Sequence, residues 1–439
     1  MKILLVNPPI YDFAAYDFWL KPYGLLSVAG YLRGSADFKL FDYLDRLHPF
    51  AAQQTGLESD RWGRGRLYCE KVPNPACLKD IPRYFRRFGL PRELFIDFLT
   101  AWQSCDFVLI QTMMTYWYPG VREVIEDIRN AWPNAKIILG GNYVTLCGKH
   151  AQRLGADLIV SGTNLDPLWQ YLGIAPDLNQ PTFWQTYEKL KTGVLKLSDG
   201  CPFNCTYCSV PKVYSKFKAR PLERSFTELE LLCRLGVENI AFYDDALLFE
   251  PEKLLIPFLN GVLQRDIKVN FHTPNALNAR FITKDLAKLM VRAGFKTFYL
   301  GFESASAKWQ QQTGSKVFSD ELAQACQYLI AAGAERQNIT AYQILGHPKT
   351  DIQQLEASMR FVNSLGIRGM LAYFSPIPGT VDGGFCHKWV DMDEPLFHNK
   401  TAFPIIMLGF DEISRLKDLQ RKLNLHLPAG KSNMTSRHL

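Results

Sequence analysis

Three cysteines crowded into eight residues constrain this chain more than any other feature of its sequence. They follow the turn at 198–200 with the spacing C-x3-C-x2-C, as Cys201, Cys205 and Cys208. A compact loop can aim three thiolates at one point, as an iron–sulfur cluster requires. Because no fourth ligand lies nearby in the sequence, one iron would keep an open coordination position. The alternative is three inert core cysteines, since free Cys is often buried. The spacing favours a reactive cluster over a sealed structural site.

The residues that follow the cysteine loop alternate between apolar runs and helical segments. Strands are expected at 194–198, 238–243, 267–271, 297–301, 339–345 and 370–374. Helices are expected between them at 223–235, 251–264, 284–293, 319–332 and 351–365. Repeated βα units form a parallel sheet, and this series predicts a partial (β/α)6 barrel over residues 188–380.

The chain before the cysteine loop shows the same alternation. Residues 1–171 carry apolar runs at 3–6, 38–43, 107–111, 136–139 and 157–160. They predict an α/β fold with a Rossmann-like parallel sheet, interrupted by an insertion at 44–90. Residues 172–187 lack periodicity and are expected to be a linker. Residues 381–439 form a C-terminal extension, and its last dozen residues are expected to be disordered.

Small and polar residues follow the strands of the first domain. Open parallel sheets bind ligands beyond the carboxyl ends of their strands, and small residues let a bulky ligand approach the backbone. The candidate binding residues at this edge are Asn7, Thr112, Gly140, Gly141 and Gly162. No G-x-G-x-x-G motif follows the first strand, which disfavours a nicotinamide dinucleotide.

The cysteine spacing, with the aromatic Tyr207 directly before the third cysteine, resembles the signature of the radical SAM superfamily. The resemblance implies a [4Fe-4S] cluster on the three thiolates, with S-adenosylmethionine (SAM) bound to the open iron. In that family an electron from the cluster cleaves SAM to a 5′-deoxyadenosyl radical.

Polar residues at the later strand ends suit such a zwitterionic, adenosine-bearing ligand. Asp244 or Asp245 can accept hydrogen bonds from an ammonium group, and Glu303 can accept from ribose hydroxyls. The segments around Glu303 and Ile344 resemble the ribose and adenine motifs of the family. Each acid taken alone could instead cap the next helix. The candidate SAM-binding residues are Tyr207, Asp244, Asp245, Asn275, Glu303, Ser304, Ile344 and Gly346.

The first domain resembles the cobalamin-binding domain of B12-dependent radical SAM enzymes. The resemblance rests on the segments 3–9 and 24–32 and on Gly140-Gly141. It implies cobalamin as a further cofactor. The D-x-H-x-x-G motif, whose His ligates cobalt in classical cobalamin domains, is absent. This absence is compatible with cobalamin, because many members of the radical SAM branch lack the motif and bind cobalamin with its lower face free of His. The alternative is a domain that holds no corrinoid and only covers the active site.

The resemblance implies an enzyme, and the leading hypothesis is a methyltransferase that acts on an unactivated carbon. An alternative enzyme would use the same radical for rearrangement, cyclisation or oxidation. A non-catalytic iron–sulfur or corrinoid sensor would need no SAM pocket. A tRNA methylthiotransferase is less favoured, because such enzymes carry further cluster cysteines in the first domain. The other cysteines there form no obvious cluster set; they are Cys69, Cys77, Cys105 and Cys147.

Composition limits the partners. A formal net charge of +7 over 439 residues is weak evidence for nucleic acid. The first residues are no secretion signal, no apolar run approaches membrane-spanning length, and ten cysteines without a signal indicate a reducing compartment. We therefore expect a cytoplasmic protein with a small-molecule substrate and a low-potential electron donor of the flavodoxin or ferredoxin type. The substrate, the oligomeric state and the role of Cys69 and Cys77 do not follow from the sequence.

Overall fold

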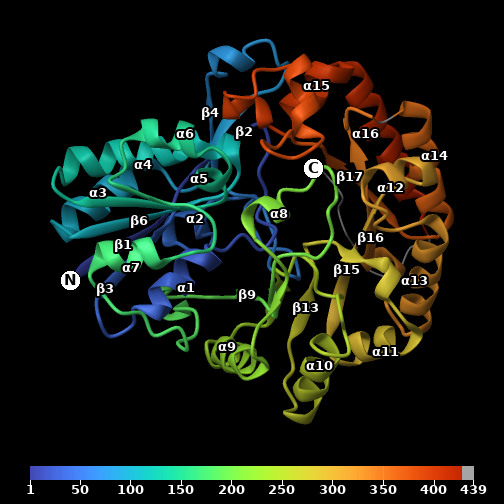
Figure 1. Cartoon of the computed structure of the whole chain (residues 1–439), viewed down its shortest axis with the longest axis horizontal. Helices are drawn as coiled ribbons and strands as arrows, with labels where there is room; N and C mark the ends of the chain where they lie inside the picture. The colour runs from blue at the N-terminus through green and yellow to red at the C-terminus, as the bar shows by residue number, and fades with distance from the viewer. Residues whose placement is uncertain (350, 428–439) are drawn as a thin grey trace.

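The computed structural model describes residues 1–349 and 351–427. The disorder expected for the last dozen residues therefore falls outside the described residues. Two parallel sheets lie side by side, and the helices at the C-terminal end pack across the top of both (Figure 1). The predicted α/β architecture is confirmed.

The first sheet has five parallel strands in the order β3-β1-β6-β7-β8. The strands are β1 (Lys2–Asn7), β3 (Asp37–Asp42), β6 (Phe107–Thr112), β7 (Lys136–Gly141) and β8 (Leu158–Val160). Helices α1 (Tyr23–Tyr31), α3 (Arg92–Trp102) and α4 (Tyr118–Ala131) lie between them in sequence, and α7 (Asp166–Leu172) follows β8. The run 3–6 is fully buried, as a strand covered on both faces requires. From β1 the chain first adds β3 on one side, and then adds β6, β7 and β8 on the other side. The crevice between β1 and β6 is therefore the topological switch point.

The second sheet is the partial barrel. It runs in the order β17-β16-β15-β13-β12-β9, and β14 (Leu277–Asn278) pairs with β15. The strands are β9 (Thr192–Leu195), β12 (Asn239–Phe242), β13 (Asn270–His272), β15 (Phe295–Glu303), β16 (Ile339–Leu345) and β17 (Arg368–Tyr373). The helices are α9 (Leu222–Arg234), α10 (Leu255–Gln264), α11 (Lys284–Arg292), α13 (Ser319–Ala331) and α14 (Ile352–Ser364). A further short helix, α12 (Ala307–Thr313), was not expected from the sequence.

The insertion 44–90 forms part of a small antiparallel sheet in the order β2-β5-β4. Its strands are β2 (Ile10–Asp12), β4 (Cys69–Val72) and β5 (Phe85–Phe88). Arg87 on β5 forms a buried ion pair with Glu123 on α4, with Nη2 2.7 Å from Oε1. The insertion is thereby fixed to the first domain by a charge pair that is satisfied on both sides.

Aromatic side chains from the first domain fill the interior of the barrel. Trp19, in the segment between β2 and α1, is fully buried. Its ring stacks on His272 with 4.5 Å between centroids, and its Nε1 donates to the carbonyl of Trp62 at 2.8 Å. Burial lowers the pKa of His272 to about 3, so the stacked imidazole is neutral at physiological pH. The two domains therefore share a core.

The C-terminal extension joins both domains. Helices α15 (Ala402–Leu408) and α16 (Phe410–Leu425) follow the barrel. Leu416 belongs to the same hydrophobic cluster as Leu4 of β1 and Leu355 of α14. The amide of Asn399 donates to the buried Asp12 at 2.8 Å. The extension thus fixes the position of the first sheet relative to the barrel.

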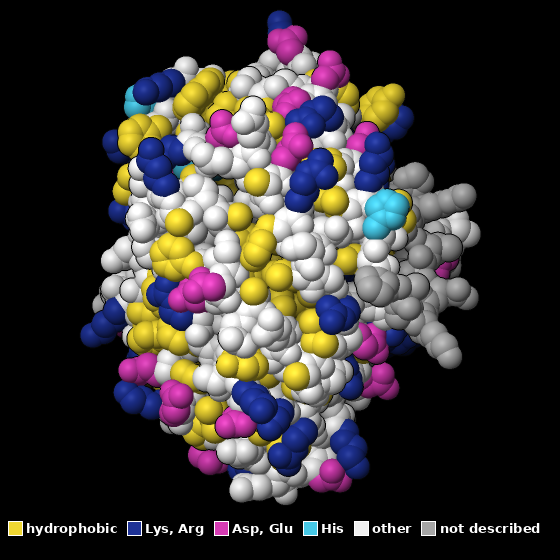
Figure 2. Space-filling model, turned by 90° about the vertical axis from the view of Figure 1, so that its right-hand side faces the viewer, with side chains coloured by type: hydrophobic (Ala, Val, Ile, Leu, Met, Phe, Trp, Pro, Cys, Tyr) yellow, Lys and Arg dark blue, Asp and Glu magenta, His cyan; other side chains and the backbone are white. Residues whose placement is uncertain are grey.

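No helix in the described part of the chain is long and apolar enough to cross a membrane. Figure 2 shows the molecule from the right-hand side of Figure 1, with acidic and basic side chains interspersed between small hydrophobic patches. That face carries no field of a single sign.

We expect Trp19→Ala to lower the free energy of unfolding by about 3–5 kcal/mol, because it empties a large, closely packed site between the two domains. Urea unfolding of the full chain, followed by circular dichroism, measures the change. Tyr84→Ala is the control, since Tyr84 is 64% exposed; it should change the free energy by less than about 0.5 kcal/mol. Equal effects of the two substitutions would contradict the packing role of Trp19.

Candidate active site

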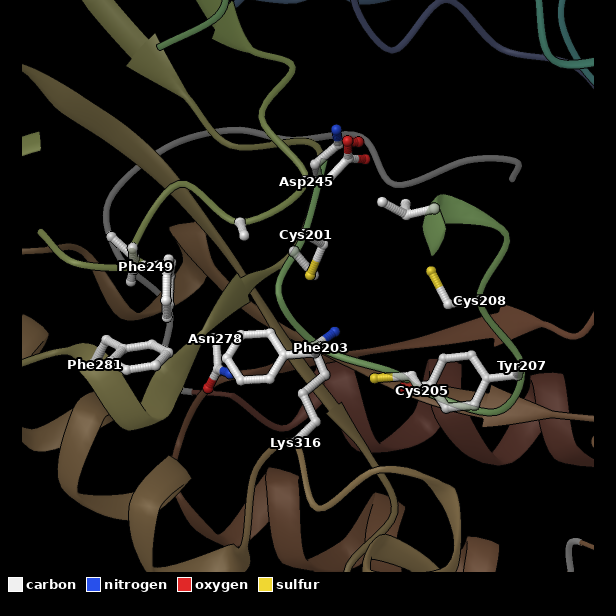
Figure 3. A pocket seen from close by; sticks show the side chains of 15 residues that line it. Cys201, Phe203, Cys205, Tyr207, Cys208, Asp245, Phe249, Asn278, Phe281 and Lys316 are labelled. Carbon is white, nitrogen blue, oxygen red and sulfur yellow. The ribbon is translucent and has the colours of Figure 1, made fainter. Parts of the chain in front are cut away.

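The cysteine loop leaves the barrel after β9 and the short strand β10 (Ser198–Asp199). Gly200 starts it with φ of +74°, and a Cβ there would lie 2.7 Å from the carbonyl oxygen of Lys216. Only glycine suits that position. Figure 3 shows that the sulfur atoms of Cys201, Cys205 and Cys208 face one common space.

The surroundings of the three cysteines favour the neutral thiol, so three thiolates here need a positively charged partner. Burial raises the pKa of Cys201 and Cys205, and it raises the pKa of Cys208 to about 12. Three neighbouring thiolates are therefore unfavourable here without positive charge between them. Within the described ranges, no group of three or more His, Cys, Asp or Glu side chains could hold a single metal ion. A cube of four irons, which takes one thiolate at each of three corners, fits this donor set.

The cysteine loop is anchored by a buried acid of the C-terminal extension. Asp382 accepts a hydrogen bond from the hydroxyl of Thr206, which lies between two of the cysteines. Its own N–H donates to the carbonyl of Thr206 at 3.0 Å. His347 Nε2 and Lys349 Nζ each lie 2.9 Å from its carboxylate. Burial alone would raise the pKa of Asp382, but the hydrogen bonds from His347, Thr206 and Lys349 outweigh it and hold that pKa well below its usual range.

A cavity of about 210 Å³ opens beside the cysteines. Phe203, Phe249 and Phe281 form one apolar wall, with Phe203 6.1 Å from each of the other two rings. The polar side chains that line the cavity are Asp245, Asn275, Asn278 and Lys316. The site therefore combines three thiols, a carboxyl group, a cation and an aromatic wall, which suits a charged ligand with a flat apolar part.

Lys316 is a site residue that the sequence analysis missed. It points toward the cysteines (Figure 3), and its Nζ lies 3.2 Å from Oε1 of Glu303. Burial opposes the ammonium charge, but Glu303 and Cys205 outweigh that effect and the pKa of Lys316 is raised. A Cβ on Gly301 would lie 2.5 Å from Nζ, so glycine makes room for this cation. Lys316 follows α12 rather than a strand, so the strand-end pattern gives no signal for it.

Glu303 itself adopts an unusual backbone conformation. It has φ of +67°, in the left-handed region that disfavours residues with a Cβ, and its side chain is only 8% exposed. Such strain persists where the surroundings fix it, often at functional sites. Glu303, which the sequence predicted as a SAM-binding residue, does not line the cavity. It contacts Lys316, which does.

The structure separates the two adjacent aspartates. Asp245 lines the cavity, together with the predicted Asn275. Asp244 does not; its carboxylate accepts hydrogen bonds from the N–H groups of Leu197 and Ser198 and from the Ser198 hydroxyl. Burial raises the pKa of Asp244 to about 6. Asp244 therefore supports the start of the cysteine loop, whereas Asp245 faces the ligand space.

The candidate residues for adenine and ribose contact lie away from the cavity. Gly346 has φ of +80°, and a Cβ there would lie 2.6 Å from Pro404 of α15, so it permits close packing of the C-terminal extension. Ile344 belongs to the hydrophobic cluster around Trp309. Ser304 accepts a hydrogen bond from the N–H of Ser306 at 3.2 Å. Tyr207 lines the cavity, and its ring stacks on Trp309 at 6.0 Å.

The candidate residues of the first domain lie along the carboxyl edge of its sheet. Asn7 Nδ2 donates to Asp42 at 2.7 Å, and the Thr112 hydroxyl donates to the carbonyl of Gly140 at 3.0 Å. Gly141 has φ of +121°, and a Cβ would lie 2.1 Å from the carbonyl oxygen of Thr112. Gly162 has φ of +72° and open space where a Cβ would stand.

This edge faces the cysteine loop. Helix α5 (Asn142–Leu146), which follows Gly141, lies against α8 (Val210–Val213), which begins two residues after Cys208. In Figure 1, α8 lies between the two sheets. A ligand on the edge of the first sheet would therefore lie next to one bound at the cysteines.

Comparison with known proteins defines the class of the second domain. Residues 195–362 match the model of the radical SAM superfamily. The chain therefore contains a radical SAM domain, and the resemblance seen in the cysteine spacing is confirmed. Such a domain implies a [4Fe-4S] cluster and SAM.

Two groups of solved structures share the fold of nearly the whole chain. The radical SAM methyltransferase TsrM from Kitasatospora setae, with cobalamin and a [4Fe-4S] cluster bound, has a TM-score of 0.66 at 12% identity, over 95% of this chain and 90% of that chain. The cobalamin-dependent SAM radical enzyme OxsB has a TM-score of 0.57 at 15% identity, over 96% of this chain and 61% of that chain. This likeness extends to the Rossmann-like domain.

Sequence relatives match only in part. An uncharacterized methyltransferase of Pyrococcus horikoshii is 27% identical over 191 residues, which is 43% of this chain and 40% of that protein. The ribosomal protein uS12 methylthiotransferase RimO of Pelobacter propionicus is 30% identical over 118 residues, or 26% of this chain and 24% of that protein. This chain therefore spans less than half the length of either relative.

We expect Asp382→Ala to loosen the cysteine loop, because it removes the acceptor for Thr206 and leaves buried donors unpaired. The substitution should lower the free energy of unfolding by about 3–5 kcal/mol. After anaerobic reconstitution, the variant should retain less iron and acid-labile sulfide per chain. Thr206→Val should show a smaller loss, since it removes one hydrogen bond. Asp391→Ala, an exposed acid of the same extension, should retain iron like the wild type. Full iron retention by Asp382→Ala would contradict the anchoring role.

Proposed function

We propose that this chain is a cobalamin-dependent radical SAM methyltransferase that methylates an unactivated carbon of a small molecule. The observation that carries the proposal is the position of α5 against α8, which brings the edge of a Rossmann-like sheet next to the cysteine loop. The same pair of domains occurs in TsrM, which is a methyltransferase. The reaction class comes from this likeness, whereas the roles below come from the chain's own residues.

When bound, the reduced cluster supplies the electron that cleaves SAM, and a methylated corrinoid supplies the methyl group. Cys201, Cys205 and Cys208 would hold three irons of the cluster and leave the fourth without a protein ligand, free to bind SAM. The protein's task is then to hold SAM in one orientation and to keep water away from the radical.

Opposite charges at the cavity suit the two ends of an amino acid. Asp245 can accept hydrogen bonds from the ammonium group of SAM, and Lys316 can donate to its carboxylate. Glu303 holds Lys316 in place and keeps it charged, because their separation is 3.2 Å in a buried setting. The wall formed by Phe203, Phe249 and Phe281 excludes water from the reacting region.

The carboxyl edge of the first sheet offers a shallow surface for a corrinoid. Gly141 and Asn142 are exposed there, and Gly162 has open space beside it. The cavity at the switch point measures only about 20 Å³, so a corrinoid would lie across the open edge instead of within a closed pocket. His150, on α6 (Gly148–Ala151), is engaged with the hydroxyl of Tyr143 at 2.6 Å. The edge residues therefore fit a corrinoid without a histidine ligand.

The small size of that cavity also favours a second candidate. In it, the first domain holds no corrinoid, and the same radical serves rearrangement, cyclisation or oxidation. The two candidates share the cluster and the SAM site, so they differ in the products formed from SAM.

Anaerobic reconstitution with iron, sulfide and hydroxocobalamin, followed by chemical reduction with SAM present, tests the proposal. We expect the desalted protein to retain about one corrinoid per chain by its visible spectrum, because TsrM and OxsB bind cobalamin with this fold. In the presence of a methyl acceptor, 5′-deoxyadenosine and S-adenosylhomocysteine should both form. 5′-Deoxyadenosine alone, without retained corrinoid, would support the second candidate. No 5′-deoxyadenosine under any reductant would contradict both.

Lys316→Met should weaken SAM binding by about 10- to 100-fold, because a charge-assisted hydrogen bond to a carboxylate contributes about 1.5–3 kcal/mol. Glu303→Gln should weaken binding less, since it leaves the ammonium group in place. Anaerobic equilibrium dialysis with labelled SAM gives the dissociation constants. Lys308→Met is the matched control, because Lys308 is exposed on the neighbouring α12. If Lys316→Met binds SAM like this control, the assigned role of Lys316 is wrong.

A further inference from the structure

Three exposed apolar side chains of the C-terminal extension form an apolar patch. Val381, Phe385 and Trp389 are 60%, 41% and 40% exposed, and they fall within nine residues around the short helix η7 (Gly383–Lys388). The Trp389 ring packs at right angles against the ring of Phe403, with 6.3 Å between centroids. Apolar side chains grouped at the surface of a folded chain mark a binding site more often than single exposed ones do.

The segment that carries the apolar patch is anchored at both ends. At one end, the N–H of Asp382 donates to the carbonyl of Thr206 in the cysteine loop at 3.0 Å. At the other, Nε2 of His398 donates to the carbonyl of Met392 at 3.1 Å, and Nδ1 of His398 lies 2.9 Å from the hydroxyl of Thr115. Thr115 follows β6 at the carboxyl edge of the first sheet. The chain that carries the patch therefore runs from the cysteine loop to that edge.

This course matters for the proposed reaction. The methyl acceptor has to approach both the cysteine loop and the edge of the first sheet. A molecule held against Phe385 and Trp389 would rest on the segment that joins these two places. Contacts to the part of a substrate that does not react can hold its reacting carbon in position.

Lysine side chains lie beside the apolar patch. Lys349 Nζ lies 5.1 Å from the centroid of the Phe385 ring. The end of the Lys212 stem would lie 3.9 Å from a Cβ on Gly379, which precedes the patch by two residues. Lys212 belongs to α8, which lies between the two sheets (Figure 1). The patch therefore has cations on the side of the cysteine loop.

A third lysine, Lys388, is exposed directly before Trp389. Acidic side chains are also near in sequence: Asp382 is buried against Lys349, whereas Asp391 and Asp393 are exposed and follow the patch. The segments 209–219 and 377–390 contain no Arg, which is the side chain that binds phosphate through two parallel hydrogen bonds. Single ammonium groups beside an apolar surface suit a carboxylate attached to an apolar molecule.

We propose that the apolar patch, with Lys212, Lys349 and Lys388 beside it, binds the methyl acceptor, and that this acceptor is an apolar carboxylic acid. Its apolar part would lie against Phe385 and Trp389, and its carboxylate would accept hydrogen bonds from the lysines. Mostly apolar contact with a few polar groups that fix the orientation is typical of small-molecule sites. The proposal rests on the proposed function, because it assigns the substrate class of that reaction.

The first test measures the binding of two probes that share one ring system. Anilinonaphthalene sulfonate is an apolar anion, and phenylnaphthylamine is its neutral analogue without the sulfonate. Anaerobic equilibrium dialysis against the full reconstituted chain with SAM gives a dissociation constant for each probe. The variants are Phe385→Ala/Trp389→Ala and Lys212→Met/Lys388→Met. The matched control is Ile96→Ala/Tyr171→Ala, because these side chains are 46% and 38% exposed on helices of the first domain.

We expect the aromatic variant to weaken the binding of both probes about tenfold or more, because it removes the apolar contact. The lysine variant should weaken binding of the anion about three- to fivefold, since exposed ion pairs are weak, and should leave binding of the neutral probe unchanged. The control should change neither constant. Equal binding of both probes by all variants would overturn the patch as a binding site.

The second test identifies the acceptor class. The reconstituted wild type is incubated with methyl-labelled SAM, a chemical reductant and a small-molecule extract of the source cells. We expect the label in a product that ethyl acetate extracts from acid and that returns to water at alkaline pH, as an apolar carboxylic acid does. The aromatic variant should form about tenfold less of this product, while its 5′-deoxyadenosine formation without extract stays at the wild-type value.

Label confined to a product that ethyl acetate leaves in acidic water would overturn the acceptor class. A loss of 5′-deoxyadenosine formation by the aromatic variant without extract would overturn the substrate role of the patch, because the substitutions would then act on the cysteine loop. If the wild type forms neither 5′-deoxyadenosine nor a labelled product, the proposed function fails. That result is separate, because the probe titrations still decide whether the patch binds an apolar anion.

Discussion

The structure depends on holding the sulfur atoms of three partly buried cysteines around one space. Burial raises the pKa of each thiol, so the loop is poor at keeping thiolates by itself and suits a cationic cluster. The surrounding elements compensate by fixing the loop. Asp244 binds the backbone before it, Gly200 permits its turn, and Asp382 holds Thr206 within it. These contacts come from different parts of the chain, so the site forms only when the fold is complete.

The C-terminal extension contacts both the cysteine loop and the first domain. It supplies Asp382 to the cysteine loop and Asn399 to Asp12 of the first domain. Its helices share a hydrophobic cluster with both sheets. Trp19, which the first domain inserts into the barrel, adds a further contact between the domains. Together these contacts set the position of the carboxyl edge of the first sheet relative to the cysteine loop. The interdomain geometry on which the proposed methyl transfer relies is therefore distributed over three segments.

Much of the fold could be predicted because it follows from local patterns. The strands of both sheets appear as apolar runs, and the cysteine loop is recognisable from spacing alone. The site was harder to predict. Asp244 and Asp245 are adjacent in sequence, but successive residues of an extended segment point to opposite sides, so only one reaches the cavity. Lys316 follows a helix that the pattern did not reveal. Ile344 and Gly346 lie at a strand end yet pack against other side chains.

The sequence by itself determined the class of chemistry and the two α/β units, because thiol spacing and hydrophobic period are short-range properties of a chain. Only the tertiary structure decided which charged groups meet. The pairing of Glu303 with Lys316, the anchoring of Thr206 by Asp382 and the position of α5 against α8 join residues that no local pattern relates. Such contacts are selected by burial, since a charge withdrawn from water is stable only beside a partner that the whole fold brings to it.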